Sequence, residues 1–148
     1  AGKERVPYRL YSQEISDLVP NELGYVSVPD ILVVEGINLL EVPPEGQAPP
    51  SDFFDYVIYL DASEEDLEKW YLDRYHLMLE INRNNPDNFF YKWANVPLEQ
   101  ADNFAKRVWR DVNLKNLHDY IEPTKKRADM IIKKYGNHEI SDMYIRKF

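Results

Sequence analysis

Cysteine is absent from the sequence and glycine is scarce, with five glycines among 148 residues. Without cysteine the chain forms no disulfide bond, has no thiol nucleophile and lacks the ligand of most zinc sites, a composition that suits the cytoplasm. None of the five glycines begins the pattern G-x-x-x-x-G-K-[ST], whose backbone amides cradle nucleotide phosphates. The sequence therefore shows no phosphate-binding loop of that kind.

Long apolar runs and an excess of positive charge are missing as well. No apolar run approaches the ~20 residues that span a bilayer, and no signal peptide opens the sequence, so we expect no membrane partner. Eighteen basic and 26 acidic residues give a net charge of -8, which argues against nucleic acid as the main partner. An anionic small molecule is still possible, because a pocket can be basic in an acidic protein.

The patterning of the remaining residues predicts an α/β fold in one domain. We expect the first 20 residues to be extended and irregular. Buried or edge strands are predicted at 25–28, 31–36, 56–61, 129–134 and 142–147, and helices at 64–83 and 97–121. Ser63 is a good N-cap for the first helix. Strands separated by helices indicate a parallel sheet, whose ligands bind beyond the carboxyl ends of the strands.

Arg74 lies on an otherwise apolar stripe of the first predicted helix. Leu67, Trp70, Tyr71 and Met78 share this stripe at helical spacing. Burying an unpaired charge costs on the order of several kcal/mol, and a planar guanidinium suits a carboxylate or a phosphate. The pattern fits a structural ion pair, a snorkelling side chain or a contact to an anionic ligand.

Aromatic residues gather directly after this helix, at residues 89–93. Together with Tyr71, Tyr75 and Met78 they could line an apolar ligand pocket or form a plain hydrophobic core. Asn113, on the second helix, could orient a polar ligand or merely cap a turn.

Two further residues lie at predicted strand ends. Glu35 closes the 31–36 strand, where an acid could help to hold a metal ion beside phosphates or could be a common strand-end acid. His138 lies in the turn after residues 129–134, where its ring could stack on a flat base. We expect His76 and His118 to be solvated, and the histidines and acids show no metal-site spacing.

Seven segments of the sequence, taken together, resemble a known protein family, whereas any one of these motifs alone would not identify it. They are PDILVVEGIN (29–38), DFFDYVIYLD (52–61), WYLDR (70–74), NPD (85–87), WRDVNLKNL (109–117), IEPTKKRAD (121–129) and NH (137–138). In this order they resemble the bacterial type I pantothenate kinase family, a P-loop kinase of the phosphoribulokinase and uridine kinase group. The resemblance implies a P-loop kinase-like parallel sheet flanked by helices. It also implies that residues 1–148 are the carboxyl-terminal part of a single kinase domain, without its P-loop half.

The resemblance further implies an activity for the longer protein. This activity is ATP-dependent phosphorylation of pantothenate, the first step of coenzyme A biosynthesis, with Mg2+ as the metal. Feedback inhibition by coenzyme A, a homodimer and a cytoplasmic location are implied too. The 148-residue chain alone is predicted to be inactive, because its main ATP and Mg2+ ligands would be missing.

Site residues follow from the same resemblance. Tyr71 and Arg74 would face pantothenate and the transferring phosphate, Asn113 would hydrogen-bond pantothenate, and His138 would pack on adenine. The other pocket positions are Tyr11, Gln13, Tyr75, Phe89, Phe90 and Trp93. The chain departs from the family at Gln13, where histidine is usual, at Ser16, where tyrosine is usual, and at Arg83, where an aromatic residue is usual.

Two other functions stay open at this stage. One is a non-catalytic fragment or ligand-binding module, which the missing P-loop favours. The other is a sister kinase that acts on uridine or glycerate, against which Tyr71 and Asn113 argue by resemblance.

Overall fold

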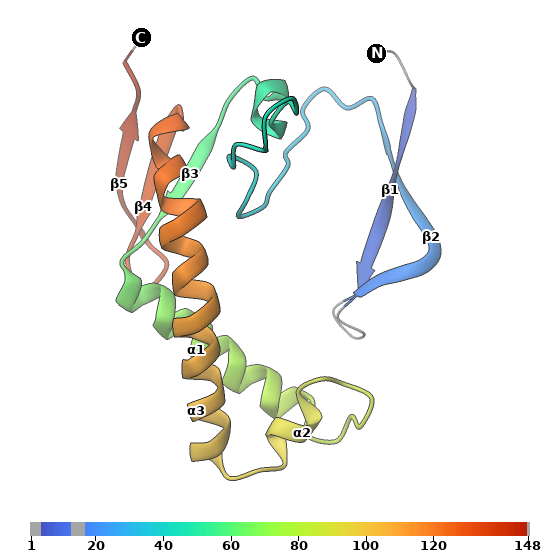
Figure 1. Ribbon diagram of the computed structural model, residues 1–148, viewed down its shortest axis with the longest axis vertical. Helices are drawn as coiled ribbons and strands as arrows, with labels where there is room; N and C mark the ends of the chain where they lie inside the picture. The colour runs from blue at the N-terminus through green and yellow to red at the C-terminus, as the bar shows by residue number, and fades with distance from the viewer. Residues whose placement is uncertain (1–3, 13–16, 148) are drawn as a thin grey trace.

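The computed structural model describes residues 4–12 and 17–147, which form a two-stranded hairpin, a three-stranded sheet and a group of helices (Figure 1). The hairpin pairs β1 (Arg5–Ser12) with β2 (Asp17–Ser27) in antiparallel register. Tyr8 lies so close over Gly24 that a Cβ there would be 2.3 Å from the tyrosine ring, and Arg5 stacks on Tyr25 at 3.9 Å. The expectation of an irregular start is therefore wrong, and the strand predicted at 25–28 is the end of a longer one.

The strand predicted at 31–36 is also wrong, because this stretch has no regular structure. It belongs to the connection between β2 and β3, in which Ile31 and Val33 are more than 80% exposed. An apolar strand buried on both faces needs a hydrogen-bonding neighbour. β3 has a neighbour on one edge only among the described residues, and residues 31–36 do not pair with its other edge.

The second sheet has the order β3-β4-β5. β3 (Ile58–Asp61) runs parallel to β4 (Met130–Lys134), and β5 (Ile140–Ile145) runs antiparallel to β4. Strands near 56–61, 129–134 and 142–147 are confirmed with small shifts of their ends. The α/β class is confirmed too, although the sheet is mixed rather than purely parallel.

The helices follow the predicted segments closely. α1 (Glu64–Ile81) begins at its predicted cap, since the Ser63 hydroxyl accepts a hydrogen bond from the Asp66 amide at 3.1 Å. α2 (Tyr91–Ala94) is a single turn. α3 (Leu98–Val108) continues through wide π-helical turns at Trp109–Leu114 and Leu117–Ile121 and a 3-10 turn at Glu122–Arg127. The second predicted helix is thus confirmed in extent, although α geometry ends near residue 108.

Buried side chains form two separate clusters. The helix cluster contains Tyr75, Leu79, Ala101 and Ala105, and the sheet cluster contains Leu40, Tyr59 and Ala128. The two alanines are fully buried, and their small side chains let α3 approach α1 closely. No helix in the described part of the chain is long and apolar enough to cross a membrane.

Candidate functional site

A cavity of about 240 Å³ opens between α1, α3 and the segment before α2. Its walls are apolar and aromatic apart from one guanidinium. The lining residues are Tyr71, Arg74, Tyr75, Met78, Phe89, Phe90, Phe104 and Val108. This volume is slightly below the usual ~300–1,000 Å³ of small-molecule sites, so the cavity can hold one compact group of a ligand.

Helical spacing explains why these residues meet. Tyr71, Arg74, Tyr75 and Met78 follow the i, i+3, i+4, i+7 pattern and form one stripe of α1. Phe104 and Val108 are one turn apart on α3 and close the opposite wall. Of the stripe predicted from the sequence, Tyr71, Arg74 and Met78 line the cavity, whereas Leu67 and Trp70 are not among its lining residues.

Phe89 and Phe90 close the third side and also join the core. Their rings meet edge to face at 5.3 Å, and Phe90 meets Tyr75 in the same manner at 6.0 Å. The Asn88 side chain accepts a hydrogen bond from the Phe90 amide at 2.9 Å and fixes the start of this turn. The two rings thus line the cavity in different ways, because Phe90 packs on the helix cluster while Phe89 stays about half exposed.

Arg74 is the only charged residue of the lining, and its side chain is exposed. Within residues 4–12 and 17–147 no carboxylate lies within ion-pair distance of its guanidinium. Its positive charge lowers the pKa of Tyr71, but burial has the larger effect and leaves that pKa raised. The structural ion pair considered from the sequence is therefore not formed, and the guanidinium is available to an anion.

Tyr75 supplies a second polar group. It is 5% exposed, and its hydroxyl has no hydrogen-bond partner among the described residues. Burial, together with Tyr71 and Asp102, raises the pKa of Tyr75 to about 12. The hydroxyl is therefore protonated at neutral pH, and a buried donor without a partner is costly unless a ligand accepts from it.

Trp93 and Asn113 lie outside this cavity. Trp93 stacks on Phe104 at 3.9 Å and lines a cleft on the other side of the helix cluster, together with Arg83. Asn113 is half-buried in the π-helical turns that follow α3. Its neighbour Trp109, four residues earlier, has its ring 5.5 Å from Tyr71. Sequence reasoning assigned no ligand contact to Trp109, although it lies one helical turn after Ala105 and is buried like it.

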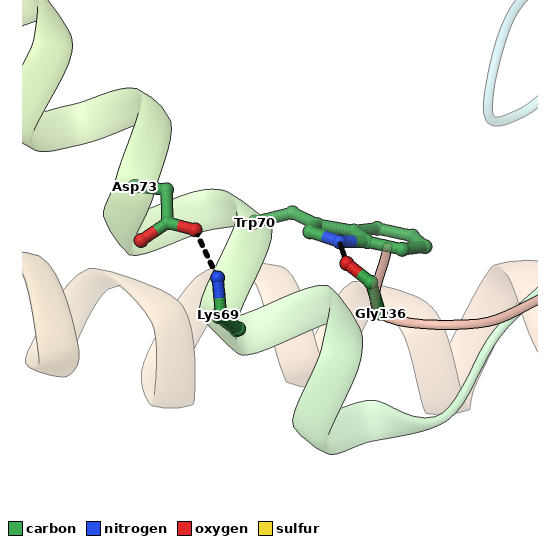
Figure 2. Close-up of polar contacts among 4 residues, drawn as sticks. All are labelled: Lys69, Trp70, Asp73 and Gly136. Atoms are coloured by element: carbon green, nitrogen blue, oxygen red, sulfur yellow. Dashed lines mark hydrogen bonds and ion pairs between the residues drawn. The ribbon is translucent and has the colours of Figure 1, made fainter. Parts of the chain in front are cut away.

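His138 lies in the turn between β4 and β5, with a left-handed φ of 67°. Its ring stacks on the Trp70 ring at 4.3 Å. The Trp70 indole donates a hydrogen bond to the Gly136 carbonyl oxygen at 2.8 Å (Figure 2). The sequence placed Trp70 on the stripe of Arg74 but did not indicate this contact to the turn. His76 and His118, expected to be solvated, are exposed but pair with Asp102 and Glu64.

The remaining predicted site residues are not gathered at the cavity. Tyr11 is 56% exposed in the hairpin. Gln13 and Ser16 lie outside the described residues. Glu35 is exposed in the irregular connection, and the described residues contain no group of three side chains that could hold a metal ion. The residues described therefore do not fit a Mg2+ site.

Comparison with known proteins supports the resemblance seen in the sequence. The chain is 44% identical over 138 residues to proteins named pantothenate kinase from Streptococcus pneumoniae serotype 4 and strain 70585. The serotype 19F protein is 43% identical over the same length. Each alignment covers 93% of this chain and 45% of the relative, so the chain spans less than half the length of these relatives. No family model matches the chain.

Proposed function

We propose that this chain is the carboxyl-terminal part of a P-loop pantothenate kinase. The longer protein would phosphorylate pantothenate to 4'-phosphopantothenate with ATP, the first step of coenzyme A biosynthesis. The observation that carries the proposal is the unpaired guanidinium of Arg74 at an aromatic cavity, in a chain 44% identical to pantothenate kinases. A cation beside an apolar cavity suits a substrate with an apolar body and a reaction that develops negative charge.

Arg74 is the residue to which we assign the catalytic role. Phosphoryl transfer depends on positioning and on charge stabilisation at the phosphoryl oxygens. The Arg74 guanidinium has no carboxylate partner within the described residues, so it does not need to break an ion pair there before it meets that charge. Tyr71 lies one turn earlier on the same stripe and would present a neutral phenol to the substrate, since its pKa is raised.

The aromatic cavity would enclose the apolar part of pantothenate. Tyr75, Phe89 and Phe90 supply its walls, and the Tyr75 hydroxyl offers a donor to a ligand carbonyl or carboxylate. We assign Tyr11, Gln13, Trp93 and Asn113 to substrate contacts by resemblance only. The pantetheine arm of coenzyme A resembles pantothenate chemically, so feedback inhibition would act through the same cavity. The longer protein would be a cytoplasmic homodimer.

ATP would supply the transferred phosphoryl group. The exposed face of His138 suits a planar base, and Arg74 suits the phosphates. Because the described residues do not fit a Mg2+ site, no step is assigned here to the metal or to Glu35. The phosphate-binding loop would belong to the longer protein, and the 148-residue chain alone should be inactive. Because the chain covers less than half of the relatives' length, a non-catalytic, ligand-binding fragment is the second candidate.

Activity of the longer protein tests the proposal. ADP release should require pantothenate and should not occur with uridine or glycerate. Arg74→Gln should lower kcat by about 100-fold or more, the usual effect of removing one charge-stabilising group. Arg107→Gln, an exposed arginine of α3 away from the cavity, is the control and should retain full activity. A normal kcat for Arg74→Gln would overturn the role of Arg74, and a wild-type protein inactive on pantothenate would overturn the function.

A further inference from the structure

Trp70 connects α1 to the turn that carries His138 by two separate contacts. The indole nitrogen donates to the Gly136 carbonyl oxygen at 2.8 Å, and the indole ring lies 4.3 Å from the His138 ring at an interplanar angle of 20°. Figure 2 shows Trp70 extending from α1 to Gly136, while Lys69 and Asp73 pair on the helix surface. One side chain therefore fixes both the backbone and the histidine ring of the turn.

The turn's own hydrogen bonds close its backbone but do not orient this ring. The Tyr135 amide donates to the Glu139 carbonyl oxygen at 2.9 Å, and the His138 amide donates to the Tyr135 carbonyl oxygen at 2.8 Å. Among the described residues, the ring's one hydrogen-bond contact is with the Lys134 ammonium, 3.4 Å from Nδ1. The left-handed φ of His138 is uncommon for residues other than glycine, although histidine adopts it more often than most. Stacking on Trp70 is therefore the main contact that sets where the ring lies.

The first turn of α1 holds the other side of this loop. A Cβ at Gly136 would lie 2.5 Å from an Asp66 carboxylate oxygen. Asp66 cannot move away freely, because its other oxygen accepts from the Ser63 hydroxyl at 2.8 Å in the N-cap of the helix. The loop thus fits between the start of α1 and the Trp70 ring, and a residue larger than glycine at position 136 would have to displace the Asp66 side chain.

The spacing on α1 relates this loop to the cavity. Trp70 and Arg74 are four residues apart, which is about 6 Å along a helix axis. The indole covers one face of the His138 ring, and His138 remains exposed. A planar ring can therefore stack on the other face while α1 sets its distance from the Arg74 guanidinium.

We propose that Trp70 is a positioning residue for nucleotide binding, which holds the His138 ring as a stacking platform at a fixed distance from Arg74. This inference rests on the proposed function. It assigns to Trp70 a role in ATP affinity rather than in pantothenate binding or in chemistry.

Two variants in the longer protein separate the two contacts. Trp70→Phe keeps a flat ring and removes the indole donor, whereas Trp70→Ala removes both. Trp70→Ala should raise the ATP Kd and KM by about three- to tenfold, the effect of losing one aromatic stacking contact. Trp70→Phe should have a smaller effect. The pantothenate KM and the kcat at saturating ATP should stay within twofold, and Lys69→Gln, an exposed neighbour, should match wild type.

A spectroscopic readout reports the platform directly. In the ¹³C-histidine NMR spectrum, the His138 ring protons should be shifted upfield by the indole ring current. The shift should be lost in Trp70→Ala and partly kept in Trp70→Phe.

If wild type does not phosphorylate pantothenate, the proposed function fails, and calorimetric ATP binding still decides the role of Trp70. An unchanged ATP Kd in a variant with a lost ring-current shift would overturn the inference. Should Trp70→Ala not fold, the Kd and spectrum of Trp70→Phe decide it.

Discussion

At the residue scale, the cavity combines an unpaired cation with an unpaired buried donor. Arg74 keeps its charge in contact with water, so its desolvation is small. The hydroxyl of Tyr75 is different, because it is withdrawn from water and has no hydrogen-bond partner in residues 4–12 and 17–147. A buried donor of this kind lowers stability in the free protein and gains a partner only when a ligand enters.

Replacing Tyr75 by Phe should therefore weaken ligand binding without lowering the stability of the protein. The free energy of unfolding of the longer protein should stay unchanged or rise by up to about 1 kcal/mol, because an unsatisfied hydroxyl is removed. Affinity for pantothenate should fall by about five- to tenfold, the worth of one hydrogen bond. Urea unfolding and calorimetric titration measure the two quantities. Tyr91→Phe, at an exposed position outside the lining, should change neither. A destabilised Tyr75→Phe protein would mean that this hydroxyl has a partner.

The residue-scale predictions from sequence succeed where contacts are local. Tyr71, Arg74, Tyr75 and Met78 share one helix, so their periodicity alone brings them together. Trp70 and Gly136 are 66 residues apart, and only the packing of α1 against the β4–β5 turn makes them neighbours. No local pattern contains that information.

At the element scale, the start of α1 is tied to the helical turns that follow α3. His118, on the turn Leu117–Ile121, bonds to the Glu64 carboxylate at 2.8 Å. This hydrogen bond raises the pKa of His118 above its usual value of 6.5, with smaller contributions from the charges of Glu64, Glu122 and Asp119 and with desolvation acting against it. The two helical segments are therefore held more strongly when the histidine is protonated.

This pair should make stability depend on pH in a definite direction. A pKa raised on folding means that the native state binds the proton more tightly, so the stabilisation is complete below about pH 6.5. It is lost as pH rises through the folded-state pKa, which lies above that value. Urea midpoints of wild type and His118→Asn should differ most at pH 5.5 and converge at pH 8.5. A difference that grows with pH would contradict the assignment.

The elements that sequence reasoning misjudged are those whose state depends on a partner strand. Residues 31–36 have the composition of a buried strand, yet a strand forms only where a neighbour satisfies its backbone. Pro7 is unfavourable inside a strand, but pairing across the hairpin and the packing of the Tyr8 ring over Gly24 outweigh that signal. Helices with a clear cap, such as α1, depend on local signals and were predicted to within about two residues.

At the scale of the whole molecule, much apolar surface is uncovered. The chain exposes 11762 Å², whereas a folded monomer of 17.6 kDa exposes about 7,900 Å². The register places six side chains on one face of the three-stranded sheet: Ile58, Leu60, Met130, Ile132, Met143 and Ile145. Four of the six, all but Met130 and Ile132, are more than half exposed. The opposite face carries Tyr59 and Ile131 and is covered by Leu40 and Ala128.

We expect this sheet face to be exposed to solvent in the chain alone and to be covered in the longer protein. Sheets of α/β proteins are covered on both faces, so the 148-residue chain should bind a hydrophobic dye and self-associate through the bare face. The double substitution Leu60→Glu with Met143→Glu should weaken both effects in the chain alone, because the two side chains are exposed there.

The same pair should destabilise the longer protein by about 2 kcal/mol or more, since covering the face would bury two unpaired carboxylates. Dye fluorescence, sedimentation and urea unfolding supply the readouts. Lys133→Gln with Lys147→Gln, at two exposed lysines, lowers the net charge by the same amount and is the charge-matched control. If the double substitution at positions 60 and 143 left the longer protein as stable as wild type, this face would stay open in it.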